Sequence, residues 1–187
     1  MNIHFEKAGP QHQAIIFAWL ETPHMKEFWD NSQEHKDDIL NFIQGRIQPS
    51  HYFNGIITYW IGAIENEPYC FILTSEVLAD NTKGIWKQHL SKTGKTYGID
   101  FGIGNEKYLG QGLAAPTLQS FTEFFQSQVD RAADTFYIDP DENNPRAKHV
   151  YEKAGFQLVG DFTMERGVFS GKKTYLMVKK IPSSSLE

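Results

Sequence analysis

The sequence predicts an α/β fold, of the α+β kind, whose central mixed sheet of about seven strands is mostly antiparallel and carries helices on both faces. Stretches that alternate apolar and polar residues are interspersed with stretches of helical periodicity, in the order strand, helices, three strands, helix, strand, helix, two strands. Only the central strand–helix–strand step has the pattern of a parallel crossover. The 187 residues suffice for one core and are short for two. We therefore expect a single domain over residues 1–181, and a tail or cloning remnant at 182–187.

The first part of the chain is expected to follow one strand with several helices. Residues 3–7 alternate in character, as a strand does. Three stretches then carry apolar residues on one stripe at helical spacing. These predicted helices span residues 10–20, 23–29 and, after Ser32, 34–47.

A hairpin and a long connection are expected next. The alternating runs 56–64 and 69–77 are joined by Glu65-Asn66-Glu67-Pro68, and turn-forming or polar residues between such runs predict a hairpin. The stretch 79–94 is mostly polar, and long connections of this kind are usually functional or mobile.

The next segment has the pattern of a phosphate site. A strand at 97–103 precedes a glycine-containing loop and a helix expected to open near Gly112, which brings free backbone N–H groups to the positive end of a helix dipole. Residues 110–115 also fit the dinucleotide pattern G-x-G-x-x-G/A, with Asp130 about 20 residues on. That alternative is weaker, because residues 105–109 separate the strand from the first glycine and no series of βαβ units follows. Ordinary turn-forming glycines are the remaining interpretation.

A second helix with clear boundaries follows a short strand at 135–138. Asn144 can cap it, Pro145 suits its first position, and Gly155 suits the residue just past its end. Four apolar or aromatic residues spaced at i, i+3, i+4 and i+7 are expected to share its inward face, so that Tyr151 points toward the sheet. These residues are Ala147, Val150, Tyr151 and Ala154. Alternating runs at 156–162 and 173–180 then predict a closing hairpin.

Composition excludes several classes of protein. A formal net charge of −5 argues against a nucleic-acid partner, which would require a basic face. One cysteine, Cys70, permits no internal disulfide and fits a reducing cytoplasm; lying in an apolar strand, it is expected to be a buried, inert thiol. No apolar run approaches the ~20 residues needed to span a bilayer. The seven histidines show no metal-binding spacing, so we expect no metal.

Two segments together resemble a known family. LGQGLA at 109–114, followed by DPDENNPRAKHVYEKAGF at 139–156, resembles the acyl-coenzyme A binding core of the GNAT N-acetyltransferase superfamily. GID at 98–100 and DP at 139–140 are similar to the aminoglycoside 6′-N-acetyltransferases. WLETPHMKEFWD at 19–30 lies where that branch has its substrate segment. The resemblance implies the GNAT fold, acetyl-CoA as co-substrate and a small cationic amine as acceptor.

The resemblance also implies roles for individual residues. Asp100 would hold the ammonium of the acceptor and help to remove its proton, and Tyr151 would protonate the departing thiolate. The implied coenzyme contacts are Ile103, Leu109, Gly110, Gln111, Gly112, Leu113, Ala114, Asn144 and Ala147. The implied acceptor contacts are His24, Phe28, Trp29, Asp30, Asp100 and Asp139.

Each of these residues also has a purely structural interpretation. Asp100 could be a surface acid on a strand, Asp139 a turn former, Asn144 a helix cap and Tyr151 a core residue. The loop before Asp100 carries four lysines and one acid, Asp80. A weakly acidic site would suit a small amine, such as a hydroxylysine-type siderophore precursor, better than an aminoglycoside. A GNAT domain that binds acyl-CoA without catalysis is the third possibility.

Overall fold

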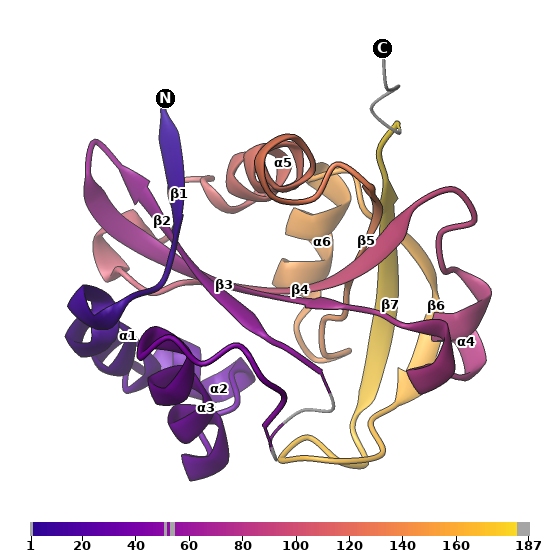
Figure 1. Ribbon diagram of the computed structural model, residues 1–187, viewed down its shortest axis with the longest axis horizontal. Helices are drawn as coiled ribbons and strands as arrows, with labels where there is room; N and C mark the ends of the chain where they lie inside the picture. The colour runs from indigo at the N-terminus through magenta and orange to yellow at the C-terminus, as the bar shows by residue number, and fades with distance from the viewer. Residues whose placement is uncertain (1, 51, 53–54, 183–187) are drawn as a thin grey trace. The chain divides into compact units, whose positions relative to one another are not determined.

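The computed structural model describes residues 2–50, 52 and 55–182. Its seven strands form one sheet in the order β1-β2-β3-β4-β5-β7-β6 (Figure 1), which confirms the predicted seven-stranded mixed sheet. The chain divides into two compact units, one comprising residues 1–75 and 100–111, the other 76–99 and 112–187. Strand β4 (Lys95–Ile103) belongs to both units, because the boundary falls between Ile99 and Asp100.

The first unit packs three helices against a β-meander. β1 (Ile3–Lys7) pairs antiparallel with β2 (Thr58–Ile64), and β2 pairs antiparallel with β3 (Glu67–Glu76). A 3₁₀ turn, η1 (Pro10–His12), leads into α1 (Gln13–Leu20), which α2 (Pro23–Phe28) and α3 (Gln33–Ile43) follow. Figure 1 shows these helices together on one side of β1–β3. Their shared core includes Ile16, Leu20, Ile39, Tyr59, Ile61 and Phe71.

Two predicted boundaries in this unit are wrong. The hairpin turn consists of Glu65 and Asn66 alone, with φ of 50° and 67°, a backbone form that suits a tight two-residue turn. Glu67 and Pro68 already belong to β3. Helix α3 ends at Ile43 instead of residue 47, since Gly45, with φ of 93°, leaves the helical conformation.

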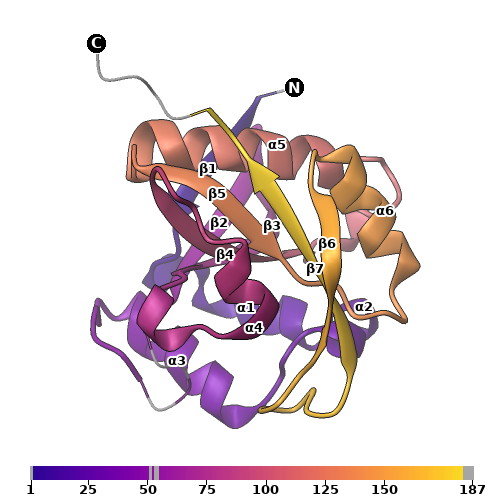
Figure 2. The ribbon, with the colours of Figure 1, turned by 90° about the vertical axis from the view of Figure 1, so that its right-hand side faces the viewer.

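The second unit has helices on both faces of its strands. β5 (Ala133–Ile138) pairs parallel with β4, and β7 (Lys173–Lys180) pairs antiparallel with both β5 and β6 (Gln157–Thr163). Helix α5 (Ala114–Phe124) continues into a π turn, η4 (Phe125–Val129), and α6 (Pro145–Lys153) lies next to β6 (Figure 2). Successive residues of β5 point to opposite faces: Phe136 packs on Phe125, and Tyr137 packs on Trp86 of α4 (Gly84–Gln88).

The stretch 79–94 connects β3 to β4 and is mostly polar, as expected, but it also contains short helical elements. It forms a short 3₁₀ turn, η2 (Ala79–Asn81), and α4. Trp86 meets Tyr137 at 5.3 Å and Phe162 at 5.5 Å between ring centroids, and the Tyr137 hydroxyl donates to the Trp86 carbonyl at 2.8 Å. Ile85 and Trp86 of α4, with Leu90 beyond its end, therefore pack against the core of the second unit, a pattern too short to recognise in the sequence.

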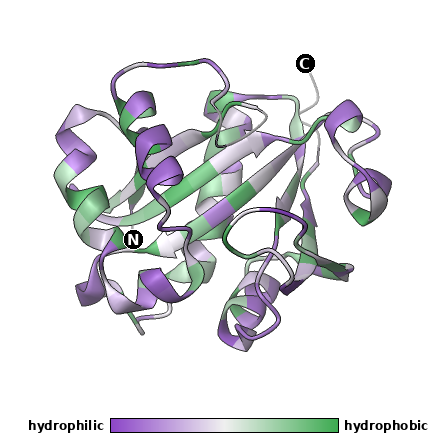
Figure 3. Cartoon of the chain, turned by 90° about the horizontal axis from the view of Figure 1, so that it is seen from below, coloured by the Kyte–Doolittle hydropathy of each residue, from purple (hydrophilic) through white to green (hydrophobic). Residues whose placement is uncertain are grey.

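Hydropathy follows the strands closely. Figure 3 shows hydrophobic colour concentrated on the strands and hydrophilic colour on loops and on many helical positions. Cys70 is fully buried and its pKa is raised to about 12 by that burial, so the predicted inert thiol is confirmed. Within the described part of the chain, no helix has the length and apolar character needed to cross a membrane.

Candidate active site

Asp100 lies on a face of β4 that glycines open to the helices of the first unit. Positions 100 and 102 share one face of the strand, and Gly104 follows directly after its end. A Cβ at Gly102 would lie 2.8 Å from Met25 Sδ and 3.3 Å from Trp29 Cζ3, and a Cβ at Gly104 would lie 2.1 Å from the Trp19 ring. Only glycine permits this close packing. Because Asp100 shares the face of Gly102, its side chain points to the side of the strand on which Trp29 packs.

Asp100 belongs to a group of three carboxylates, which we call the carboxylate cluster: Asp30, Asp38 and Asp100. The Tyr52 hydroxyl donates to Asp30 Oδ2 at 2.6 Å, and the Tyr59 hydroxyl donates to Asp38 Oδ2 at 2.6 Å. Burial raises the pKa of both tyrosines, and these hydrogen bonds raise it further. The charges of Asp38 and Asp100 add to the shift of the pKa of both hydroxyls. The three acids therefore share one electrostatic environment.

The pKa values of two of these acids are shifted in opposite directions. The side chain of Asp100 reaches solvent, yet the protein around it excludes enough water that burial raises its pKa to about 6. Burial also acts to raise the pKa of Asp30, but hydrogen bonds from Tyr52 and Ser32 outweigh it and lower that pKa. At neutral pH, Asp30 is therefore a fixed anion, whereas Asp100 is close to its titration range. Such a divergence is typical of sites that divide charge binding from proton transfer.

Aromatic rings surround the cluster. His35 is 1% exposed and stacks on Tyr52 with ring centroids 4.7 Å apart, while Trp29 packs on Phe71 at 5.4 Å. The Nδ1 atom of His35 lies 2.7 Å from the carbonyl oxygen of Asp30 and must donate to it. Burial lowers the pKa of His35, which keeps the ring neutral. Its Nε2 atom and the Trp29 Nε1 atom are buried without a hydrogen-bond partner among the described residues.

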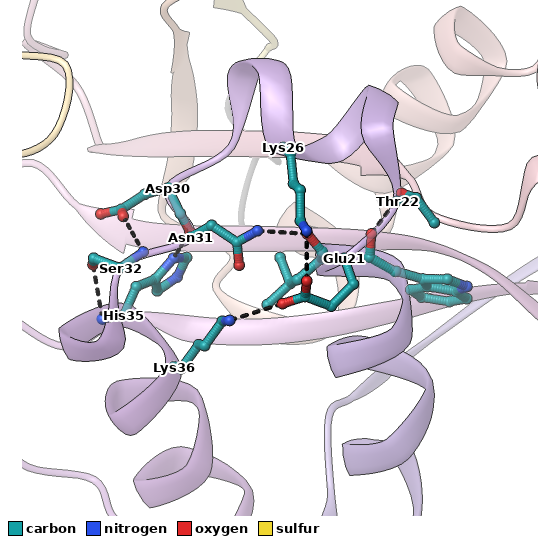
Figure 4. A network of polar contacts seen from close by, with 10 residues as sticks. Glu21, Thr22, Lys26, Asp30, Asn31, Ser32, His35 and Lys36 are labelled. Carbon is teal, nitrogen blue, oxygen red and sulfur yellow. Dashed lines mark hydrogen bonds and ion pairs between the residues drawn. The ribbon is translucent and has the colours of Figure 1, made fainter.

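Figure 4 shows how the segment that carries Asp30 is held. The Ser32 amide donates to Asp30 Oδ1 at 2.8 Å, and the Ser32 hydroxyl caps α3 by accepting from the His35 amide at 3.2 Å. Nearby, Glu21 bridges Lys26 of α2 and Lys36 of α3, and hydrogen bonds from these two lysines lower its pKa to about 2. Capping and ion pairing together fix the chain between α2 and α3.

The two other predicted acceptor residues of this unit lie on α2. Nε2 of His24 donates to the Ile103 carbonyl at 2.8 Å, and its Nδ1 lies 3.9 Å from Glu106 Oε1. His24 thus ties α2 to the end of β4, where the predicted coenzyme residue Ile103 lies. Phe28, the last residue of α2, is 36% exposed. An acceptor contact for either side chain stays a prediction.

The predicted phosphate loop has the backbone that its glycines require. Gly110 and Gly112 both have φ of 73°, and a Cβ on either would meet nothing within 4 Å. Conformation, and not lack of space, therefore demands glycine at both positions. The helix begins at Ala114, two residues later than expected, because the left-handed Gly112 cannot join it. Amides at the start of a helix lack intrahelical acceptors and can bind an anion. Besides these glycines, the loop consists of Leu109, Gln111, Leu113 and Ala114.

In the second unit, α6 is built as predicted. Asn144 Oδ1 caps it by accepting from the Ala147 amide at 3.0 Å, and Gly155, with φ of 92°, follows its end. Tyr151 is 9% exposed and packs on Phe156 with ring centroids 6.3 Å apart. The inward direction of this tyrosine is therefore confirmed.

Asp139 follows β5 directly, and Asp141 shapes the turn that comes after it. Asp141 Oδ1 accepts from the Asn143 amide at 2.8 Å, which makes an Asx turn. The acceptor role predicted for Asp139 stays a prediction. No group of three or more His, Cys, Asp or Glu side chains suited to a metal ion occurs in residues 2–50, 52 and 55–182.

Sequence reasoning missed Asp38, Tyr52 and Tyr59. One signal was available for Asp38, which stands on α3 between the buried His35 and Ile39 and so borders the apolar face. The composition of the loop before Asp100 predicts a weakly acidic site, but that loop does not supply the carboxylates. There, Lys83 pairs with Glu165 at 2.8 Å, while the carboxylates of the cluster come from other elements.

Comparison with known proteins shows the family of the chain. A family model described as an acetyltransferase (GNAT) domain matches residues 10–164. The aminoglycoside N(6′)-acetyltransferase type 1 of Klebsiella pneumoniae is 28% identical over 154 residues, which cover 82% of this chain and 73% of that protein. The kanamycin resistance protein of Rhizobium radiobacter is 32% identical over 85 residues, 46% of this chain and 76% of that protein.

Solved structures share the fold. The aminoglycoside N(6′)-acetyltransferase of Legionella pneumophila superposes with a TM-score of 0.72 at 24% identity, over 96% of this chain and 94% of that one. The acetyltransferase AAC(6′)-Ib, in complex with coenzyme A and kanamycin, superposes with a TM-score of 0.71 at 21% identity, over 96% and 95% of the two chains. Because the family match extends over most of the sequence, the chain belongs to the GNAT acetyltransferase family.

Proposed function

We propose that this protein transfers the acetyl group of acetyl-CoA to a primary amine of a cationic acceptor, which is the 6′-amine of an aminoglycoside and not a simple monoamine. The observation that carries the acceptor assignment is the carboxylate cluster, with Asp30, Asp38 and Asp100 beside two tyrosines. One ammonium group needs one carboxylate partner, and three carboxylates match an acceptor with several ammonium groups. The aminoglycoside acetyltransferases among the relatives support the same acceptor class.

The proposed step is a direct transfer. The neutral amine attacks the thioester carbonyl, the new N–C bond forms and the C–S bond breaks. Asp100, with a pKa of about 6, is ionised above that pH; it binds the ammonium and accepts the proton whose loss makes the amine neutral, and the nitrogen loses its second proton to solvent as the amide forms. Tyr151 gives its phenolic proton to the departing thiolate and recovers one from solvent.

The coenzyme is assigned to the loop at 109–114 and to α6. Backbone amides of the loop and of the first turn of α5 would hold the pyrophosphate. Ile103, Asn144 and Ala147 would lie along the coenzyme arm. Asn144 keeps its capping bond to Ala147 in this arrangement, so the structural and functional interpretations of that residue are compatible.

The test is a panel of acceptors, with release of free coenzyme A thiol as the readout. Kanamycin should be acetylated, and an aminoglycoside that carries a hydroxyl in place of the 6′-amine should not. Faster turnover of hydroxylysine than of kanamycin would replace the acceptor class with a small amine. If acetyl-CoA binds to saturation but no acceptor in the panel leads to thiol release, the protein would be a non-catalytic module. The cytoplasmic location inferred from the sequence stays a prediction.

A further inference from the structure

The carboxylate of Glu67 gathers an unusual number of polar contacts at the base of the phosphate loop. The Tyr108 hydroxyl donates to Glu67 Oε2 at 2.5 Å, and Lys107 Nζ donates to the same oxygen at 2.6 Å. Asn105 Nδ2 donates to the Pro68 carbonyl at 3.4 Å and lies 3.5 Å from Glu67 Oε1. We call these four residues, Glu67, Asn105, Lys107 and Tyr108, the Glu67 anchor.

Backbone contacts strengthen the same junction. The amides of Gly104 and Asn105 both donate to the Tyr69 carbonyl, at 2.9 and 3.1 Å, and the rings of Tyr69 and Tyr108 lie 5.4 Å apart. Residues 104–108 are therefore fixed against the first residues of β3. The tight turn at Glu65 and Asn66 sets where Glu67 lies, because only two residues separate β2 from β3.

The chain leaves the Glu67 anchor directly into the loop at 109–114. Leu109 follows Tyr108, and its amide closes the 3₁₀ turn η3 (Glu106–Tyr108) by donating to Glu106 at 3.1 Å. The Gln111 side chain reaches back to the Lys107 carbonyl at 2.6 Å. The loop itself has two glycines with positive φ, which have wide conformational freedom in a chain that is not held. The position and direction in which the loop begins thus depend on residues 105–108, which the Glu67 anchor holds.

We propose that Glu67 is a positioning residue for coenzyme binding, which acts through Tyr108 and Asn105 to hold the phosphate loop in its binding conformation. A loop held in advance loses less conformational entropy when it binds its ligand, so the affinity is higher. Glu67 touches neither the acceptor nor the reacting atoms in this mechanism. The inference rests on the proposed function only in taking 109–114 as the coenzyme loop.

The test measures the dissociation constant of coenzyme A by calorimetry, without any acceptor. Tyr108→Phe keeps the ring beside Tyr69 and removes only the hydroxyl; Glu67→Ala removes the whole anchor. Each should weaken coenzyme A binding about tenfold, the effect expected when a hydrogen bond to a charged group is lost. The double variant should bind no more weakly than Glu67→Ala alone, because the contact that Tyr108→Phe breaks is one of those that Glu67→Ala already removes. Glu65→Gln, two residues away and exposed, removes the same charge and should bind as the parent does.

Kinetics separates positioning from loss of fold. In both anchor variants KM for acetyl-CoA should rise while kcat at saturation and KM for the acceptor stay near parental values. Coenzyme A binding within twofold of the parent in both variants would overturn the proposal. So would a parallel loss of coenzyme and acceptor affinity together with a melting point lowered by more than about 5 °C, which would mean general destabilisation. If the parent itself binds no coenzyme A, the proposed function fails first.

Discussion

Replacing Asp100 with asparagine tests the charge and basicity of the acceptor site. Asn keeps the shape of the side chain and loses both properties. Because burial raises the pKa of Asp100 to about 6, its ionised fraction falls from roughly nine-tenths at pH 7 to roughly one-tenth at pH 5. In the parent enzyme, kcat/KM should therefore fall about tenfold over this range from Asp100 alone, beyond the loss of neutral amine in solution. Asp100→Asn should lower kcat/KM at pH 7 by about 10²–10⁴-fold.

The assay is initial-rate thiol release at saturating acetyl-CoA, from pH 5 to pH 9, for parent and variant. The variant should lose the inflection near pH 6 and regain part of its rate at high pH, where solution supplies neutral amine. Affinity for acetyl-CoA should not change. A variant profile that overlays that of the parent would refute the reasoning and return Asp100 to a surface strand acid.

The same raised pKa makes a prediction about stability. A carboxyl group whose folded-state pKa lies above its unfolded value favours the folded state at low pH, and this contribution is lost as the pH rises through the folded pKa. Ionised Asp100 should therefore cost stability above pH 6. Asp100→Asn should melt at a higher temperature than the parent at pH 8, with the difference shrinking toward pH 4. An equal difference at both pH values would contradict the burial argument.

Three further variants test the remaining parts of the site. Tyr151→Phe keeps the packing and removes the proton, so kcat should fall ~10²–10⁴-fold with acetyl-CoA affinity unchanged; an unaltered kcat would make Tyr151 a core residue only. Gly112→Val should abolish acetyl-CoA binding, whereas Gly167→Val, at a matching φ of 78° with equally open space, should cost similar stability, on the order of 1–3 kcal/mol, and bind normally. Asp38→Asn should raise the acceptor KM ~5-fold with kcat preserved; the adjacent, exposed Asp37→Asn is its control, and equal effects of the two would remove Asp38 from the site.

Local patterns were enough to predict helix α6 and strand β7. The cap at Asn144, the terminal Gly155 and the buried face of Tyr151 are all encoded within one helix, and the structure has each of them. Strand β7 spans residues 173–180, as its alternation predicts. The start of α5 was placed two residues early, because a glycine before a helix gives no sign of whether its φ is positive.

The carboxylate cluster and its tyrosines depend on pairs of residues that are distant in the sequence. Tyr52 and Asp30 are 22 residues apart, and Tyr59 and Asp38 are 21 apart. The alternation of a strand predicts only whether a tyrosine points inward or outward. It does not predict which carboxylate the tyrosine hydroxyl will bond to. The same limit applies to Glu67 and Tyr108, which are 41 residues apart. Only the folding of the whole chain brings such partners together.

The opposite pKa shifts of Asp30 and Asp100 let one site bind charge and move a proton in the same pH range. Asp30, held ionised by Tyr52 and Ser32, keeps its charge as the pH falls through 6, whereas Asp100 loses its own. Acidification should therefore reduce reaction before it reduces binding of an acceptor with several ammonium groups. Between pH 7 and pH 5, kcat for such an acceptor should fall more steeply than its KM rises. For a monoamine held by Asp100 alone, the same change should act mainly on KM, so the pH dependence of the two constants distinguishes the acceptor classes independently of their absolute rates.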